Sequence, residues 1–357
     1  MIRNRKLWLS GFALVLVHLL VVCARFFAPY DPNEQHRDFP LAPPVRVHFS
    51  DSRGRFHLRP FVCPWLVDGQ QAGSQGYRDD CGQASPIRFF VRSATMREGD
   101  IRKATWHLFG VDAPAQVFLL GTDDYGRDLF SRLFYGGQTS LGAGLLAAGL
   151  SLSLGLLLGC MAGYLGSWVD DVIMRGAELF MALPWIYLLF AVRAFLPLHL
   201  GARQAFLLLI GVIGVTGWAR PSRLIRGVIL STKERGYVLA ALGFGASSVS
   251  IVRRHILPEV SSVALTQAAL LVPQYILAEV TFSFLGLGVG EPEPSWGNML
   301  ASLQTYSILE GHWWMFASGL ALVPIFLLFY SFADSLQAHF QIFDVSSEGC
   351  PAAVFVK

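Results

Sequence analysis

Three carboxylates stand close together in the run GTDDYGRD, at Asp123, Asp124 and Asp128. Carboxylates at this spacing can bind a metal ion or act as an acid and base pair. A structural role explains them more simply, because Thr122 or Asp123 can cap a short helix that begins near Tyr125 and enters an apolar segment. We therefore expect no catalytic residue and no metal site in this run.

The histidines of the polar region 28–138 occur singly, at His36, His48, His57 and His107. A zinc site needs several ligands brought together, and the region contains no cluster with metal-ligand spacing. We expect these histidines to be solvated or hydrogen bonded.

The five cysteines differ in their surroundings. Cys23 and Cys160 lie in apolar runs, where a free thiol behaves as a small hydrophobic group. Cys63 and Cys81 lie in a polar stretch rich in Pro and Gly. If this stretch is outside the cytoplasm, a disulfide between them is favoured over two free thiols.

Few charged residues interrupt the apolar segments of the chain, and two of them, Arg193 and Glu279, lie at similar depth. A charge that faces lipid at the bilayer centre costs several kcal/mol, so both should face protein or an interface. One interpretation is a pair that lines a translocation path. Separate extension of each side chain to the outer surface is an equal alternative.

The segment from Thr232 to Pro258 has the pattern of two short helices joined by a glycine hinge. Gly243 and Gly245 interrupt the first helix, and Ser247 can cap the second by accepting a backbone N–H, as can its neighbour Ser248. This pattern indicates a cytoplasmic docking element, and the alternative is an interfacial helix on anionic lipid.

Composition places these motifs in a membrane protein, because the chain of 357 residues is 53% hydrophobic and only 15% charged. The net charge of +3 is small, and we expect contact with membrane lipid and none with nucleic acid.

The first apolar segment is longer than the core of a signal peptide and lacks a small-residue cleavage site, which favours an uncleaved span. Six apolar segments are predicted to span the membrane: Leu7–Phe27, Thr139–Leu165, Val172–Leu198, Gln204–Ala219, Ser261–Leu287 and Trp313–Ser335.

Charge predicts the orientation of these spans. The segment 220–257 holds seven Lys or Arg residues and 288–312 holds none, so the first is predicted to be cytoplasmic and the second external. Six spans then leave both termini in the cytoplasm. The insert between the first two spans becomes an external domain, with a strand near 86–91 and a turn or second short strand near 105–110.

Glycines form a stripe along the second span, at Gly155, Gly159 and Gly163. Small residues four apart let another helix approach backbone to backbone, although Gly is also common in membrane helices in general.

Five blocks of the chain, in order, resemble the dipeptide, oligopeptide and nickel permease family of ABC importers, DppC/OppC type. They are LGTDDYGRDLFSRLFYGGQTSL, DDVIMRGAELFMALP, GWARPSRLIRGVIL, YVLAALGFGASSVSIVRRHILP and FSFLGLGVGEPEPSWGNML. The resemblance implies the type I importer permease fold, an all-α membrane protein of six helices, here with a small mixed external domain between helices 1 and 2. It also implies a multi-pass location in a bacterial inner membrane.

The fourth block resembles the family's cytoplasmic EAA loop, which rests on an ATPase subunit. Matched by position, the coupling residues are Leu239, Ala240, Ala241, Gly245, Arg253, Arg254, Ile256, Leu257 and Pro258. Leu239 stands where the family usually has Glu, so docking here would depend on apolar contact and on the two arginines, or on a compensating ATPase surface.

The resemblance further implies a second permease subunit, two cytoplasmic ATPases and an external substrate-binding protein as partners. This chain lacks G-x-x-x-x-G-K-[ST], so ATP and Mg²⁺ are expected on the ATPases and no cofactor on this chain. Alternative interpretations are an exporter permease, a non-transporting receptor module of the same fold and, third, a membrane enzyme. The predicted division is 1–27 for the first helix, 28–138 for the insert, 139–335 for a five-helix core with its coupling loop at 220–258, and 336–357 for the tail.

Overall fold

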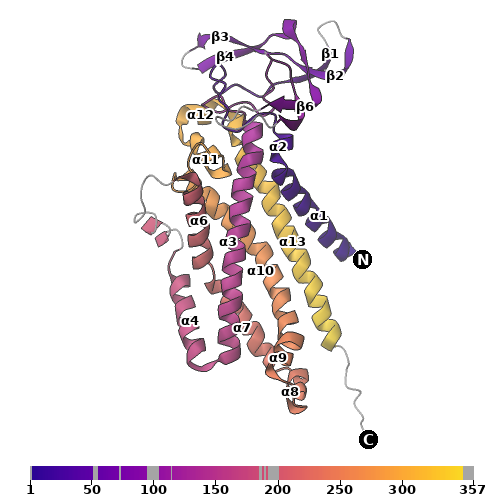
Figure 1. Ribbon diagram of the computed structural model, residues 1–357, viewed down its shortest axis with the longest axis vertical. Helices are drawn as coiled ribbons and strands as arrows, with labels where there is room; N and C mark the ends of the chain where they lie inside the picture. The colour runs from indigo at the N-terminus through magenta and orange to yellow at the C-terminus, as the bar shows by residue number, and fades with distance from the viewer. Residues whose placement is uncertain are drawn as a thin grey trace. The chain divides into compact units, whose positions relative to one another are not determined.

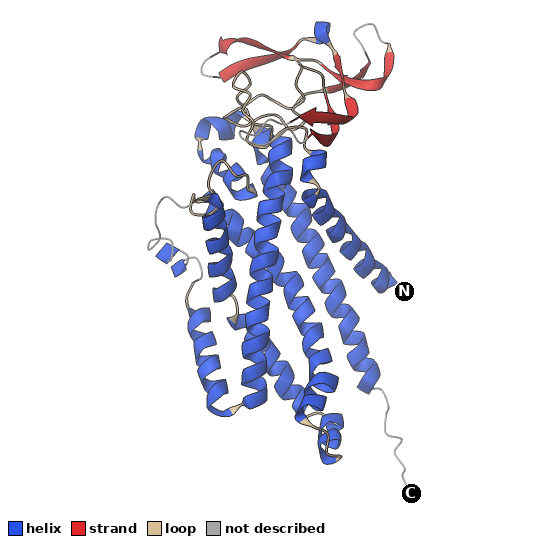
Figure 2. Ribbon diagram, viewed as in Figure 1, coloured by secondary structure: helices blue, strands red, loops and turns tan. Residues whose placement is uncertain are grey.

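A computed structural model of the chain describes residues 2–50, 55–71, 74–94, 104–113, 115–184, 187–188, 190–191 and 201–348. These residues are mostly helical, with β-strands confined to one part of the chain (Figure 1, Figure 2). The chain divides into two compact units. The first comprises Met1–Val15, Ala143–Glu279 and Pro324–Lys357, and the second comprises Leu16–Gly142 and Val280–Val323.

The longer helices are α1 (Ile2–Val22), α3 (Leu129–Leu165), α4 (Ser167–Ala182), α6 (Ala202–Thr216), α7 (Ala219–Lys233), α10 (Leu257–Phe284) and α13 (Ala317–Glu348). Shorter helices are α2 (Ala24–Phe27), α8 (Gly236–Gly243), α9 (Ser248–Ile251), α11 (Trp296–Ala301) and α12 (Tyr306–Gly311). A π-helical turn, Val252–Ile256, joins α9 to α10. Short 3₁₀ turns lie at Cys81–Gln83, Ser302–Gln304 and Trp313–Phe316.

Among the described residues, five segments are long and apolar enough to cross a membrane. They are Arg5–Val22, Leu129–Leu165, Arg203–Lys233, Ser248–Phe284 and Trp313–Phe340. The predicted span 172–198 is described only in part: α4 covers its first half, and most of the remainder lies outside the described residues. The sixth span therefore stays a prediction.

One difference from the sequence prediction concerns residues 220–233, which were assigned to a loop because of their charge. They lie in the helix α7, and its buried residues include Ile225 and Ile229. The arginines misled the prediction because they occupy one side of an amphipathic helix whose other side is packed. Only the segment from Glu234 to the start of α10 remains as a connection with short helices.

The described residues of the polar insert form three small antiparallel sheets. Strand β2 (Phe56–Val62) lies between β1 (Val47–Ser50) and β5 (Ser85–Pro86). β3 (Trp65–Gln71) pairs with β4 (Ser74–Asp79), and β6 (Arg88–Ala94) pairs with β7 (Ala104–Gly110). The hairpin of β6 and β7 confirms the strands predicted near 86–91 and 105–110. The sheet core is a cluster of buried side chains: Val45, Val62, Ile87, Phe109, Val117 and Phe118.

The glycine stripe of α3 packs against the backbone of α7. A Cβ built on Gly155 would lie 2.6 Å from Pro221 Cβ, and one on Gly159 would lie 2.7 Å from the Ser222 carbonyl oxygen. At Gly163 the built Cβ would lie 2.9 Å from Ile229 Cβ. The predicted close approach is confirmed, and α7 is the helix that makes it.

A larger side chain in this stripe should force α3 and α7 apart. We predict that Gly159→Leu lowers the melting midpoint of the purified protein and its folded yield, since overpacking costs about 1–3 kcal/mol or more. Gly149→Leu in the same helix is the matched control, because a Cβ at Gly149 meets nothing within 4 Å. Equal losses in the two variants would contradict this packing.

Candidate functional site

The short helix α8 separates an exposed apolar side from a buried one. Val238 is 1% exposed and joins a cluster with Ile225 and Ile229 of α7. On the other side Leu239 is 55% exposed, and Phe244, just after the helix, is 92% exposed. An exposed apolar surface on an element that is itself well packed is typical of a contact site for another protein.

Gly245 ends α8 in a Schellman motif. Its φ of +81° lies in the left-handed region, which glycine adopts without strain. The N–H of Gly245 donates to the Leu242 carbonyl at 2.9 Å, and the N–H of Ala246 donates to the Ala241 carbonyl at 3.0 Å. This turn directs the chain to Ser247, whose side chain accepts from the Ser250 N–H and caps α9, one of the two predicted capping serines.

Two basic side chains tie the ends of this connection to other helices. Lys233 donates from Nζ to the carbonyls of Gly163 (3.1 Å) and Tyr164 (3.0 Å), at the carboxyl end of α3 where helix carbonyls lack partners. Arg235, which precedes α8, pairs with Glu259 in the first turn of α10 at 3.0 Å. The docking helix is thereby fastened to two long apolar helices.

A third tie lies near the middle of α7. The guanidinium of Arg226 forms a bidentate pair with the carboxylate of Asp170, in the first turn of α4. Planar donors matched to both carboxylate oxygens give a geometrically specific contact. Since Asp170 is at a helix amino end, the helix dipole also favours its charge.

The other residues matched by position to the EAA loop differ in their exposure to solvent. Ala240 and the arginines Arg253 and Arg254 are exposed, and Ala241 is half-buried. Ile256 is buried, whereas Leu257 and Pro258 at the start of α10 are exposed. We refer to the exposed residues Leu239, Ala240, Leu242, Phe244, Arg253 and Arg254 as the docking surface. Its leucine, alanine and phenylalanine side chains are apolar, and its two arginines are basic.

Glu279, proposed with Arg193 as a pair along the path, is fully buried near the end of α10. Arg193 lies outside the described residues, so the pairing stays a prediction. Burial of Glu279 agrees with a carboxyl group that faces protein in a membrane helix.

The run GTDDYGRD folds differently from the capped helix that the sequence predicted. Asp123 accepts the N–H groups of Tyr125 and Arg127, both at 2.9 Å, and closes a turn in which no helix begins. Helix α3 starts at Leu129, and Asp128 caps it by accepting from the Ser131 N–H at 2.8 Å. The predicted cap was wrong by several residues, because the Asp123 side chain stabilises the turn instead.

The same run carries an ion network in which the side chains of Asp123, Arg127 and Arg132 are buried and that of Glu291 is 44% exposed. Arg127 pairs with Asp123 at 2.7 Å and with Glu291 at 2.5 Å, and Arg132 pairs with Glu291 at 3.0 Å. These four side chains line a cavity of about 260 Å³. Removing one partner of such a network leaves an uncompensated buried charge. The network therefore links the run to the distant segment that holds Glu291.

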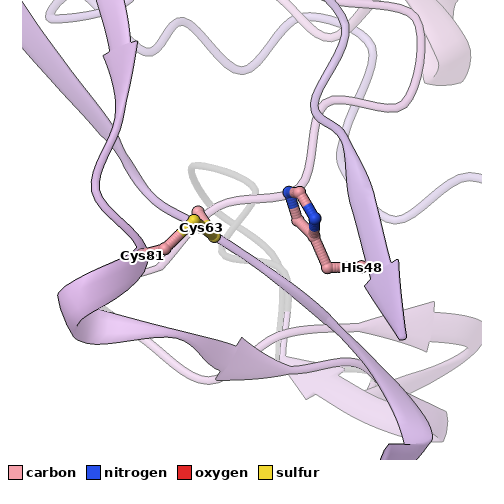
Figure 3. Close-up of side chains that lie close together, drawn as sticks. All are labelled: His48, Cys63 and Cys81. Atoms are coloured by element: carbon pink, nitrogen blue, oxygen red, sulfur yellow. A yellow bond between two sulfur atoms is a disulfide. The ribbon is translucent and has the colours of Figure 1, made fainter. Parts of the chain in front are cut away.

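The insert contains a disulfide between Cys63 and Cys81 with Cα atoms 4.7 Å apart. His48 lies beside it, as Figure 3 shows, and its ring nitrogens and the two sulfurs are close enough for a shared metal. Because the two sulfurs form a disulfide bond, neither is a thiolate that could bind a metal. This cluster has the chemistry of a structural cross-link rather than a metal centre.

The chain resembles characterised transport proteins. The family described as "Binding-protein-dependent transport system inner membrane component" matches residues 155–341. A dipeptide transport system permease protein, DppC, of Bacillus subtilis is 37% identical over 201 residues, which are 56% of this chain and 61% of that protein. A di/tripeptide transport system permease protein, DppC, of Pseudomonas aeruginosa is 30% identical over 328 residues, 91% of this chain and 84% of that protein. Among solved structures, a chain of an amino acid ABC transporter has a TM-score of 0.46 at 14% identity, covering 58% of this chain and 94% of that chain.

The chain belongs to the family of inner-membrane components of binding-protein-dependent transport systems. It is a multi-pass permease subunit of an ABC importer, and the alternatives of an exporter or a receptor module are not favoured. These relatives are named as permease subunits.

Stability should depend on pH through the cap of α3. Burial raises the pKa of Asp128 to about 7, against hydrogen bonds from Ser131 that lower it. The pKa of Asp128 is therefore higher in the folded protein than in the unfolded protein. Its contribution to the free energy of unfolding is full below about pH 4 and is lost as the pH rises through about 7. We predict that Asp128→Asn, which keeps an accepting cap, removes this loss and melts at a higher temperature than the parent at pH 8.

Melting midpoints of both proteins across this pH range measure the effect. One pKa unit corresponds to about 1.4 kcal/mol, so the difference should exceed the error of the method. Asp112→Asn, at an exposed carboxylate paired with Arg88, is the control. Parallel pH profiles for the parent and Asp128→Asn would contradict the assignment.

Proposed function

We propose that this chain, together with a second permease subunit, forms the path through which an ATP-driven importer moves peptides or similar small solutes. The relatives named as dipeptide and di/tripeptide permeases support this substrate class. An external binding protein would deliver the solute, and two cytoplasmic ATPases would supply the energy. The proposed location is a bacterial inner membrane with six spans, both termini in the cytoplasm and the insert 28–138 outside.

The observation that carries the coupling proposal is the docking surface on α8. A free-standing apolar helix would be costly to expose and easily displaced. Here Val238 is buried beneath the surface, and Lys233 and Arg235 fix both sides of the connection. The ATPase would thus meet a preorganised helix, which lowers the entropy cost of binding.

ATP binding to the partner subunits would move the docking surface as one body with the helices to which it is tied. Lys233 transmits the displacement to the end of α3, and Arg235 transmits it to α10 through Glu259. Since α7 packs on the glycine stripe of α3, these helices would shift together. The result is a rigid-body switch between two states biased by ATP and by the loaded binding protein.

The residue at the motif's acidic position defines the chemistry of docking here. Leu239 is exposed and cannot form the charge-assisted contact that Glu would make, so apolar burial replaces it. Exposed Arg253 and Arg254 provide the polar part of the contact. We propose that the matching ATPase cleft is apolar with an acidic rim.

A charge placed at the hinge should uncouple transport. We predict that Gly245→Asp abolishes transport-coupled ATPase activity while the complex still assembles, because the carboxylate would stand next to the apolar docking surface. Gly245→Asn is the matched control, since Asn has nearly the same shape, is neutral and tolerates the left-handed region. A Cβ at Gly245 meets nothing within 4 Å, so neither side chain clashes within the chain.

Both variants are measured as co-expressed complexes for binding-protein-stimulated ATPase activity and solute uptake. Substantial activity is expected with Gly245→Asn. Full activity with Gly245→Asp would remove the basis for the docking assignment, and equal loss in both would assign the effect to the backbone.

The most exposed side chain of the docking surface should contribute directly to affinity. We predict that Phe244→Ser weakens binding of the isolated ATPase by about tenfold or more, as burial of such a side chain is worth about 1.5–3 kcal/mol. Leu58→Ser in β2 is the control, because Leu58 is also 92% exposed. Unchanged ATPase affinity with Phe244→Ser would argue against apolar docking.

A further inference from the structure

The hairpin of β6 and β7 contains an aromatic residue in a strained conformation. Phe89 pairs with Phe109 and Val91 pairs with His107 in one continuous register, so Phe90 lies within the strand, opposite Leu108. Its φ of +56° is unusual for any residue other than glycine and costs free energy, most of all for a bulky side chain. The Phe90 ring is 63% exposed, and the ring of the preceding Phe89 is also exposed. A strained backbone that exposes two adjacent aromatic rings indicates a surface with a function.

The outward face of the hairpin combines aromatic and basic side chains. Trp106 is 57% exposed, and its cross-strand partner is Arg92, which is also exposed. Arg88 forms an exposed ion pair with Asp112 at 2.6 Å. Aromatic rings with arginine beside them are the residue types enriched where proteins meet the headgroup layer of a membrane.

The position of the hairpin brings this face to the ends of two candidate spans. The Phe90 ring centroid lies 6.2 Å from that of Phe26, in α2 directly after the apolar span that ends at Val22. Phe27 stacks on Phe134 in the second turn of α3, with centroids 5.7 Å apart. In β7, His107 Nδ1 is 2.6 Å from the Ala28 carbonyl oxygen, which fixes the hairpin to the same place. Figure 1 draws β6 next to α2.

We propose that the outward face of this hairpin is a membrane-binding site, in which the rings of Phe90 and Trp106 enter the headgroup layer and Arg92 binds a phospholipid phosphate. The ends of two spans in the same compact unit set the depth of the bilayer surface, and Phe90 contacts one of those ends. Rings that lie at this depth gain from burial at the acyl boundary, and arginine matches phosphate geometry. Lipid is favoured over a protein partner because the face is continuous with the boundary of the spans.

Such a membrane contact is separate from transport and does not depend on the side of the membrane that the hairpin occupies. Its consequence is that the insert is anchored to the bilayer beside the first span. An anchored insert would keep a fixed orientation over the membrane surface.

Photo-crosslinking in the native complex tests the proposal. The chain carrying p-benzoylphenylalanine at position 90 or 106 is expressed with its partners, illuminated in membranes and analysed for phospholipid adducts by mass spectrometry. The control is the same group at position 58, since Leu58 is more exposed than either ring but lies in β2. We expect lipid adducts at 90 and 106 to be several-fold above those at 58.

A second variant separates lipid contact from a folding defect. Phe90→Asn suits the positive φ and removes the ring, and it should lower the lipid adduct at position 106 while the Cys63–Cys81 disulfide still forms. In nanodiscs, Arg92→Gln should reduce adducts with phosphatidylglycerol. Equal lipid yields at 90 and 58, adducts at 90 with another protein in place of lipid, or an absence of lipid adducts at both 90 and 106 would each overturn the proposal.

Discussion

The close approach of α3 and α7 is the constraint on which the coupling region depends. Glycines at three successive turns of α3 admit the backbone of α7, and no larger residue would leave room at Gly155 or Gly159. This contact brings Lys233 to the free carbonyls at the end of α3 and Arg226 to Asp170. Without it, Lys233 would lose its carbonyl partners at the end of α3.

These ties explain how an exposed apolar surface can be kept on a short helix. α8 has only eight residues, too few to be stable alone in water. Its stability comes from burial of its own Val238 side chain, from the Schellman turn at Gly245 and from the flanking side chains of Lys233 and Arg235. The exposed Leu239 and Phe244 are therefore available for a partner without being needed for folding.

Local sequence patterns predicted much of the coupling region. They could not predict contacts between residues that are far apart in the sequence. The sequence was enough to predict the glycine stripe, the turn at Gly245 and the cap at Ser247, because each depends on residues that are close together in the chain. The Arg226–Asp170 pair joins residues 56 positions apart, and the Glu291 network joins residues more than 150 apart. The cap of α3 was placed wrongly because Asp123 and Asp128 are equally good caps in isolation. Only packing decides which carboxylate meets which N–H groups.

The central claim is that the docking helix moves as one body with α3. Spin labels at Gly243 and Leu165, in a chain whose Cys23, Cys160 and Cys350 are replaced by Ser, report the distance between α8 and the end of α3 by double electron–electron resonance. The measurement compares the assembled complex without nucleotide and trapped with ATP. The account predicts the same narrow distance distribution in both states. A distance that changes with nucleotide, or a broad distribution in either state, would contradict it.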